Sequence, residues 1–387
     1  TGPRGGTRLP RVRSSQAAAK ARRRPSASVV TVVGARPQFV KVAPLSRALR
    51  RQVKEVLVHT GQHYDAEMSD AFFEELRLPR PDHHLGIGSA SHGRMTGRML
   101  EALEAVLLAE RPALVMVLGD TNSTLAGALA AVKLGIPVAH VEAGLRSFDM
   151  AMPEEINRRL TDHLSRLLFC PTGTAVENLR REGIRRGVHR VGDVMVDALQ
   201  QNLARARRMR LPAGFKAREY YLATLHRQEN VDDPARLRAI LDTLGRLPHP
   251  VVLPLHPRTR ERLARMGVAP GGTICLHPPA SYLEMLLLES NARMVLTDSG
   301  GVQKEAFILG TPCVTLREQT EWVETVEAGA NILAGASPTR ILRAVAAFER
   351  GGPRVRRRHP YGDGDACERI AQVIARFVTE SGDSLTA

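Results

Sequence analysis

ALVMVLGDTNST, residues 113–124, is the stretch that decides the fold class of this chain. Its first half, 113–118, is an apolar run without a polar residue, which is typical of a strand buried on both faces of a parallel sheet. Its second half begins with a glycine turn, and the simplest role for Asp120 or Asn122 is to cap a helix over 123–133. A buried strand that leads into a helix is the repeating unit of doubly wound α/β domains.

The same unit recurs along the chain. Ten apolar runs predict strands, in two series of five that helical segments separate. The first series is Val29–Val33, Val53–Val58, Ala113–Leu118, Pro137–Val141 and Leu167–Cys170, and the second is Tyr220–Thr224, Val251–Pro254, Thr273–Leu276, Met294–Thr297 and Cys313–Leu316. Two series predict an α/β protein with two doubly wound, Rossmann-like domains that face each other across a cleft. We place the N-terminal domain at 28–193 and the C-terminal domain at 194–365, and we expect a last helix at about 366–387 to pack back on the first domain.

The charge of the chain is unevenly distributed. The 387 residues include 55 Lys and Arg against 40 Asp and Glu, a formal net charge of +15, and 43% of them are hydrophobic, as in ordinary globular proteins. Residues 1–25 hold eight basic side chains and no acidic one, so we expect a disordered basic tail over 1–27. A nucleic-acid-binding protein is an alternative explanation of the charge, but aromatic residues are only 4% and no binding module is visible. No apolar stretch is long enough to predict a membrane span, so we expect neither nucleic acid nor membrane as a partner.

The cysteines and histidines give no sign of a metal or disulfide framework. The four cysteines are Cys170, Cys275, Cys313 and Cys367. They lie far apart and form no C-x-x-C pair, which fits a reducing cytoplasm. His59 and His63, and the pair His83-His84, lack a third ligand nearby, so we predict no metal site.

Polar residues that directly follow strands are the site candidates, because ligands bind beyond the carboxyl ends of strands in open α/β sheets. Glu142 follows strand 137–141, and no helix that it could cap begins before Pro153. We expect Asp120, Glu142 and Glu154 to share one rim of the first sheet. Carboxylates that crowd one rim favour raised pKa values and acid/base chemistry.

Cations and histidines follow other strands. Arg36, in the turn after strand 29–33, is suited to clamp a phosphate, and Lys41 lies near the same strand end. In the second series, His226 and His256 each follow a strand and are candidates for the opposing rim.

A nucleotide-binding turn follows the strand at 294–297. Ser299-Gly300-Gly301 opens a helix there, so backbone N–H groups can approach an anion closely. Glu305, one helical turn further on, is placed to reach a ribose, as acids do in nucleotide sites. Carboxylates on one rim and nucleotide-binding groups on the other predict a nucleotide-sugar site.

Taken together, these motifs resemble the non-hydrolysing UDP-N-acetylglucosamine 2-epimerases, which have the glycosyltransferase-B-type fold. The matching strings are GARP at 34–37, HTGQH at 59–63, GDTNST at 119–124, HVEAGLR at 140–146, PEEINR at 153–158, HR at 226–227, TDSGG at 297–301 and PYGDG at 360–364. The resemblance covers roughly residues 29–380. It implies a UDP-binding C-terminal domain and a metal-independent, cofactor-free enzyme, often a homodimer.

The resemblance also implies roles for individual residues. The implied acid/base groups are Asp120, Glu142, Glu154 and His226; the implied substrate contacts are Arg36, Lys41, Arg146, Ser299, Gly300, Gly301 and Glu305; and Gln62 and His63 match the place where some bacterial members bind a second, activating substrate molecule. The implied reaction interconverts UDP-N-acetylglucosamine and UDP-N-acetylmannosamine by elimination of UDP across C1–C2 to a glycal, followed by readdition. A hydrolysing epimerase that releases free N-acetylmannosamine is the alternative on the same scaffold.

Two positions depart from the better-known members of that family. Trp322, in the string TEWVE at 320–324, stands where those members carry an arginine, and Met285 stands where an aromatic residue usually stacks near the uracil. The variants at Gln38, Ser147-Phe148, Gln228 and Trp322 resemble a subgroup that includes epimerases of UDP-2,3-diacetamido-glucuronic acid. We expect Trp322 to face the cleft and to help select the sugar; the alternative is that it packs between helices.

Overall fold

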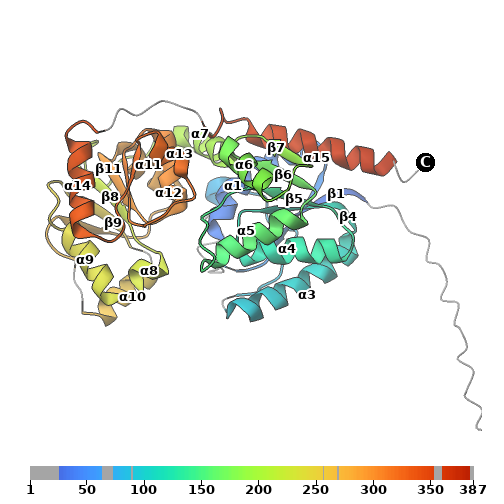
Figure 1. The fold of residues 1–387 in the computed structure, drawn as a ribbon, viewed down its shortest axis with the longest axis horizontal. Coiled ribbons are helices and arrows are strands. Elements are labelled where there is room, and N and C mark those ends of the chain that lie inside the picture. The colour runs from blue at the N-terminus through green and yellow to red at the C-terminus, as the bar shows by residue number, and fades with distance from the viewer. Residues whose placement is uncertain are drawn as a thin grey trace, which may run out of the picture.

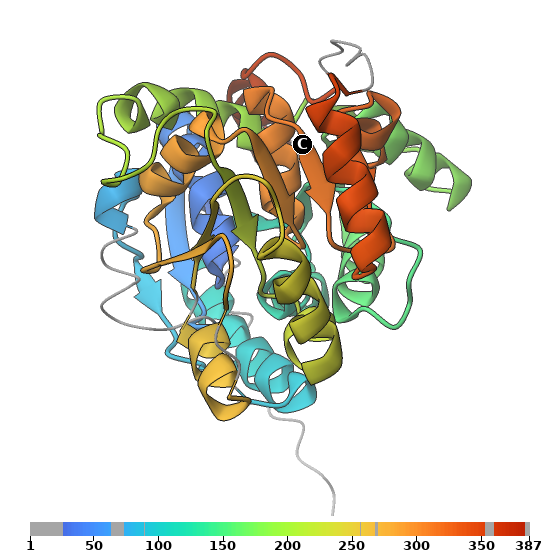
Figure 2. The same ribbon diagram turned by 90° about the vertical axis from the view of Figure 1, so that its left-hand side faces the viewer.

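The computed structural model describes residues 26–62, 73–88, 90–255, 257–267, 270–352 and 360–383. Of the tail predicted over 1–27, residues 1–25 lie outside these ranges, whereas 26 and 27 already belong to the first strand. Two parallel sheets form two lobes that lie side by side, with the first sheet on the right in Figure 1 and the second on the left. Turned by 90°, the second lobe faces the viewer with the first behind it (Figure 2). No helix in the described ranges is both long and apolar enough to cross a membrane.

The first sheet, with the helices around it, forms what we call the N-terminal unit. Its strands pair in the order β3-β2-β1-β4-β5-β6-β7, and all neighbours are parallel. The strands are β1 (Ser26–Val33), β2 (Lys54–His59), β3 (His83–His84), β4 (Pro112–Leu118), β5 (Val138–Val141), β6 (Leu167–Cys170) and β7 (Val188–Arg190). The helices are α1 (Arg36–Leu49), α3 (His92–Glu110), α4 (Asn122–Lys133), α5 (Pro153–Leu164) and α6 (Gly173–Arg181).

The second sheet and its helices form the C-terminal unit. Its strands pair in the order β10-β9-β8-β11-β12-β13, again all parallel. The strands are β8 (Tyr221–Thr224), β9 (Val251–Pro254), β10 (Ile274–His277), β11 (Met294–Thr297), β12 (Cys313–Thr315) and β13 (Asn331–Leu333). The helices are α8 (Gln228–Val231), α9 (Pro234–Leu244), α10 (Pro257–Arg265), α11 (Tyr282–Asn291), α12 (Gly300–Leu309), α13 (Val323–Glu327) and α14 (Pro338–Glu349).

All ten predicted strands are confirmed, and three further strands lack the apolar run that predicted the others. These are β3, β7 and β13, which have only two or three residues each and lie at sheet edges. An edge strand pairs on one side and is partly exposed, so its sequence need not be continuously apolar. The sequences HH, VHR and NIL therefore gave no strand signal.

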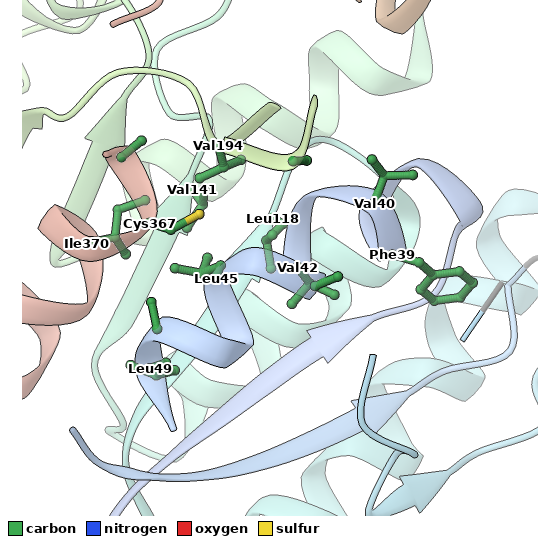
Figure 3. Close-up of a cluster of buried hydrophobic side chains, with 14 of the residues drawn as sticks. Phe39, Val40, Val42, Leu45, Leu49, Leu118, Val141, Val194, Cys367 and Ile370 are labelled. Atoms are coloured by element: carbon green, nitrogen blue, oxygen red, sulfur yellow. The ribbon is translucent and has the colours of Figure 1, made fainter. Parts of the chain in front are cut away.

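Two more helices complete the fold: α7 (Val194–Ala206), which contacts both units, and the C-terminal α15 (Ala366–Asp383). On one side α7 packs on α1 and α15, and on the other it packs on α11 and α12. Although α15 comes last in the sequence, Cys367 and Ile370 lie in one buried cluster with Leu45 and Leu49 of α1 and Val194 of α7 (Figure 3). The N-terminal unit thus buries the last helix of the chain in its own core.

The chain passes between the units twice, and the two passages meet. The N–H of Asp193 donates to the carbonyl of Tyr361 at 2.8 Å. Gly192 has a φ of +91°, and a Cβ there would lie 3.0 Å from the same carbonyl oxygen. We call this contact the crossover. It joins the two segments of the chain that pass between the units.

Gly144, in the loop after β5, offers a test of how tightly the N-terminal unit is packed. Its φ is +79°, and an added Cβ would lie 2.3 Å from the Ala175 carbonyl oxygen of α6. Gly183 has a similar φ of +83° but open space around it. Both Gly→Ala changes carry a left-handed strain of roughly 1–2 kcal/mol. We expect Gly144→Ala to lower the urea midpoint clearly more than Gly183→Ala does; equal losses would mean that α6 shifts without cost.

Candidate active site

Glu142 lies where the carboxyl ends of the two sheets meet. It directly follows β5, is buried, and has a φ of +71°, which is uncommon for a residue other than glycine and is typical of functional sites. Lys41 of α1 donates to its Oε2 at 2.5 Å. Lys304 of α12, in the other unit, donates to its Oε1 at 3.1 Å. One carboxylate thus binds an ammonium group from each unit.

The expectation that crowded carboxylates raise their pKa values is wrong for Glu142. Burial by itself would raise its pKa, but the Lys41 and Lys304 ammonium groups outweigh burial and hold the pKa at about 2. The sequence argument placed Lys41 near this rim but did not pair it with Glu142, and it missed Lys304. In this arrangement the carboxylate of Glu142 is ionised at neutral pH.

Asp120 does not cap the helix that follows it, nor does Asn122. Thr121 is the N-cap of α4, and its Oγ1 accepts from the N–H of Thr124 at 3.3 Å. Threonine caps here because Asn122 is already the first helical residue. The half-buried Asp120 carboxylate instead pairs with the guanidinium of Arg158 on α5. Asp120 therefore has no capping role, and its carboxylate contacts α5 through Arg158.

The two acids in the first turn of α5 have different surroundings. Glu155 is fully buried and accepts from the N–H of Ser147 at 2.8 Å and from Arg158 at 3.1 Å, so it holds the preceding loop. Glu154 is half-buried and makes no hydrogen bond or ion pair with the described residues. Of the two, only Glu154 has a carboxylate that is available to a ligand.

His226, on the C-terminal unit, is held by an aspartate that the sequence did not single out as a site residue. Its Nδ1 lies 3.1 Å from Asp298 Oδ1, and its side chain is 48% exposed. Asp298 is fully buried and also accepts from the N–H of Arg227 and from Asn230 Nδ2. Burial alone would raise the pKa of Asp298, but these partners lower it. The ionised Asp298 orients His226 and leaves its Nε2 for a ligand.

The start of α12 has the features of an anion site. Ser299 is its N-cap, and the first-turn N–H groups of Gly300 and Gly301 have no acceptor within the helix. A Cβ on Gly300 would lie 2.5 Å from Glu321 Oε1 and 3.2 Å from Trp322 Nε1. Only glycine therefore fits at this position of the turn.

Glu305 lies in a second buried acidic group. Burial raises its pKa to about 7, and burial together with the neighbouring Glu305 raises the pKa of Glu289 on α11 well above its usual range. Neither carboxylate oxygen of Glu289 has a hydrogen-bond partner in the described ranges. Because Glu305 is only 6% exposed, its predicted contact with a ribose stays a prediction.

Arg146 lies within the N-terminal unit, and the Nε, Nη1 and Nη2 atoms of its guanidinium all donate hydrogen bonds there. Its Nη1 donates to Asp162 at 2.7 Å, and its Nε and Nη2 form a two-point contact with Glu182 at 2.8 and 2.7 Å. Asp162 in turn accepts from His140 Nδ1 at 2.7 Å, and His140 Nε2 donates to the carbonyl of Gly119 at 2.8 Å. These contacts assign Arg146 to holding the loop after β5 and not to substrate.

Other predicted positions fall at or beyond the edge of what the structure describes. Gln62 Oε1 accepts from the N–H and Oγ of Ser123, at 3.0 and 2.7 Å. His63, His256 and the side chain of Arg36 lie outside the described residues, so their predicted roles stay predictions. Where the structure describes the chain, no group of three or more His, Cys, Asp or Glu side chains could hold a metal ion.

Trp322 packs between the units, and it also borders the anion site. It is the N-cap of α13, is only 4% exposed, and lies in one apolar cluster with Ala143 and Leu168 of the N-terminal unit and with Tyr361. The Lys304 ammonium lies 4.0 Å from the centre of its ring. Its Nε1 has no hydrogen-bond partner among the described residues. Trp322 is thus a packing residue, and its predicted selection of the sugar stays a prediction.

Comparison with known proteins finds relatives over nearly the whole described length. A family described as UDP-N-acetylglucosamine 2-epimerase matches residues 47–375. The UDP-2,3-diacetamido-2,3-dideoxy-D-glucuronate 2-epimerase of Pseudomonas aeruginosa is 51% identical over 90% of this chain and 99% of its own length. The UDP-N-acetylglucosamine 2-epimerase of Methanococcus maripaludis is 46% identical over 89% and 97%. The crystal structure of the Methanocaldococcus jannaschii UDP-GlcNAc 2-epimerase with UDP-GlcNAc and UDP superimposes with a TM-score of 0.84 at 46% identity, over 90% and 99%.

The buried acids Glu289 and Glu305 predict a pH dependence of stability. Their folded-state pKa values lie above the usual 4.5, so the folded chain binds protons more tightly than the unfolded chain. The contribution of these two acids to stability is fully present below pH 4.5 and is lost as pH rises through the folded-state values, which for Glu305 means about pH 7. Glu289→Gln should unfold near the wild-type temperature at about pH 5 and above it at about pH 8.

The matched control is Glu219→Gln, since the Glu219 side chain is 63% exposed and its loss should shift neither melting temperature. If Glu289→Gln melts below wild type at both pH values, the carboxyl of Glu289 contributes hydrogen bonds that outweigh its burial.

Proposed function

The chain belongs to the UDP-N-acetylglucosamine 2-epimerase family, and from this premise we propose that it inverts C2 of a UDP-linked 2-acetamido sugar in the space between its two units. The observation that carries the location is Glu142, an ionised carboxylate held between Lys41 and Lys304 where the sheets meet. A base is needed there because the C2 proton of such a sugar is only weakly acidic.

The proposed reaction proceeds by elimination and readdition. A carboxylate removes the proton from C2, the C2–H electrons form the C1=C2 double bond, and the C1–O bond breaks so that UDP leaves with its electron pair. UDP then adds back to C1 while C2 takes a proton on the opposite face. Asp120, Glu142 and Glu154 lie on the N-terminal unit, and His226 lies on the C-terminal unit, which supports proton transfer from two sides.

We assign the departing diphosphate to the start of α12. The free N–H groups of Gly300 and Gly301, with the Ser299 hydroxyl, present partial positive charge to an anion. Arg36 is the first residue of α1 and Lys41 lies in its second turn, and the N–H groups of Gly34 and Ala35 before this helix are already taken by Gln38 Oε1. Stabilising the leaving group therefore depends on these side chains and on α12.

UDP-N-acetylglucosamine is the first candidate substrate. UDP-2,3-diacetamido-glucuronic acid is the alternative, and one observation supports it: the chain is 51% identical to the Pseudomonas aeruginosa enzyme, against 46% for the Methanococcus maripaludis enzyme. We further propose that Trp322 Nε1, which has no partner in the described ranges and lies beside Gly300, donates to the bound nucleotide sugar.

We also propose that the protein is a homodimer and that it acts in the cytoplasm. Four large apolar side chains are exposed on α5 and the loop before it, and they supply a surface for a second copy of the chain. These are Phe148, Met150, Ile156 and Leu160. Size-exclusion chromatography with light scattering tests the dimer.

A two-substrate experiment in heavy water tests the reaction. We expect one of the two candidate UDP-sugars to be epimerised, with deuterium at C2 of a product that is still linked to UDP. Full retention of the original C2 hydrogen would exclude elimination, and free sugar with free UDP would identify a hydrolysing enzyme. In the same panel, Trp322→Phe should raise KM if Nε1 donates to the substrate.

Variants of Glu154 and His226 test the acid/base assignment. Glu154→Gln and His226→Asn should each lower kcat by about a hundredfold, as expected for a lost proton-transfer group. Glu154 has no partner in the described ranges, so the thermal midpoint of Glu154→Gln should stay at the wild-type value. Glu177→Gln, on the exposed face of α6, is the matched control and should keep full turnover. Normal turnover in Glu154→Gln would remove it from the mechanism.

A further inference from the structure

Lys304 is fully buried, which is rare for a lysine and requires that its charge be compensated. Its ammonium donates to Glu142 Oε1 at 3.1 Å and to Asp193 Oδ2 at 2.6 Å. The indole ring of Trp322, 4.0 Å away, covers it. Burial would lower the pKa of Lys304, but Asp193 and Glu142 outweigh burial and raise it, so the side chain stays charged.

The two carboxylates that bind Lys304 belong to different parts of the structure. Glu142 is the proposed acid/base group at the end of β5. Asp193 is the N-cap of α7, where its Oδ1 accepts from the N–H of Met195 at 2.8 Å, and its own N–H makes the crossover contact with Tyr361. Lys304 itself comes from the second turn of α12, directly after the anion-binding turn. The ammonium group of Lys304 thus contacts both Glu142 and Asp193 of the crossover, and it is carried by α12, the helix whose first turn we assign to the diphosphate.

Geometry makes this contact conditional on the arrangement of the two units. Glu142 moves with the N-terminal unit and Lys304 with the C-terminal unit, whereas Asp193 lies at the point where they join. If the units separate, the contact between Lys304 and Glu142 is lost, because the two residues belong to different units. Glu142 then keeps only Lys41, which belongs to its own unit.

We propose that Lys304 is a positioning residue of the epimerase: it ties Glu142 to the crossover at Asp193, so that this carboxylate is aligned only when the two units are closed on each other. The inference rests on the proposed acid/base role of Glu142. It adds a residue to the reaction that touches neither sugar nor diphosphate and acts through the carboxylate it holds.

Replacement of Lys304 by methionine tests the proposal by steady-state kinetics. We expect kcat to fall about tenfold to a hundredfold, as for a misaligned reacting group, while KM changes little. Lys304→Arg keeps the charge and should recover part of kcat. Lys216→Met, at a side chain that is 78% exposed, is the matched control and should match wild type.

The pH profile separates positioning from mere stabilisation. The charged groups around Glu142 are Lys41 and Lys304, with Asp193 and Glu305 next to Lys304. Removing Lys304 leaves one ammonium on Glu142, so its pKa rises and it is protonated at higher pH. The acid limb of kcat/KM should therefore move to higher pH in Lys304→Met and should return toward wild type in Lys304→Arg.

A second variant guards against a folding defect, because Lys304→Met leaves Asp193 buried without its partner. The double variant Asp193→Asn with Lys304→Met removes that charge and keeps a capping side chain. It should melt above Lys304→Met and still show the low kcat and the shifted acid limb. If kcat and the acid limb of the double variant match wild type, Lys304 is structural only and the inference is overturned. If Glu142→Gln keeps full turnover, the proposed role of Glu142 fails, and the inference fails with it.

Discussion

The structure depends on a buried contact where the sheets meet, in which the carboxylate of Glu142 binds the buried ammonium of Lys304 and the partly buried ammonium of Lys41. Neither Lys304 nor Glu142 is stable there alone, since an unpaired charge in the interior is costly. The contact therefore holds only when both units are correctly placed. It also determines the chemistry, because the two ammonium groups keep Glu142 ionised at neutral pH.

Around that contact, buried polar networks hold the loops that carry the site. Arg146 and His140 both bind Asp162, and this fixes the backbone after β5, where Gly144 also donates to Asp162. On the C-terminal unit Asp298 does the same for the loop of His226. Glu142 and His226 each follow a strand end, and a neighbouring charged group holds each of them in place. Such preorganisation is what proton transfer at a weakly acidic carbon requires.

The sequence led to the correct fold but to only part of the site. Apolar runs identified ten strands because burial on both faces leaves a local signature, whereas the short edge strands have none. Strand-end position singled out Glu142 and His226, since the carboxyl ends of parallel strands share one edge. It missed Lys304, Asp298 and Arg158, whose importance lies in partners that are distant in the sequence. It also assigned Arg146 to substrate, although Asp162 and Glu182 occupy its guanidinium.

By itself the sequence determined the two parallel sheets and the residues that follow their strands, because strand burial and glycine turns are local properties. Only the tertiary structure decided which charges meet. A lysine in the string GGVQKEA carries no local sign that it will be buried against Glu142 and Asp193. Ion pairing depends on distance in space and on exclusion of water, and neither is set until both units have folded and packed against each other.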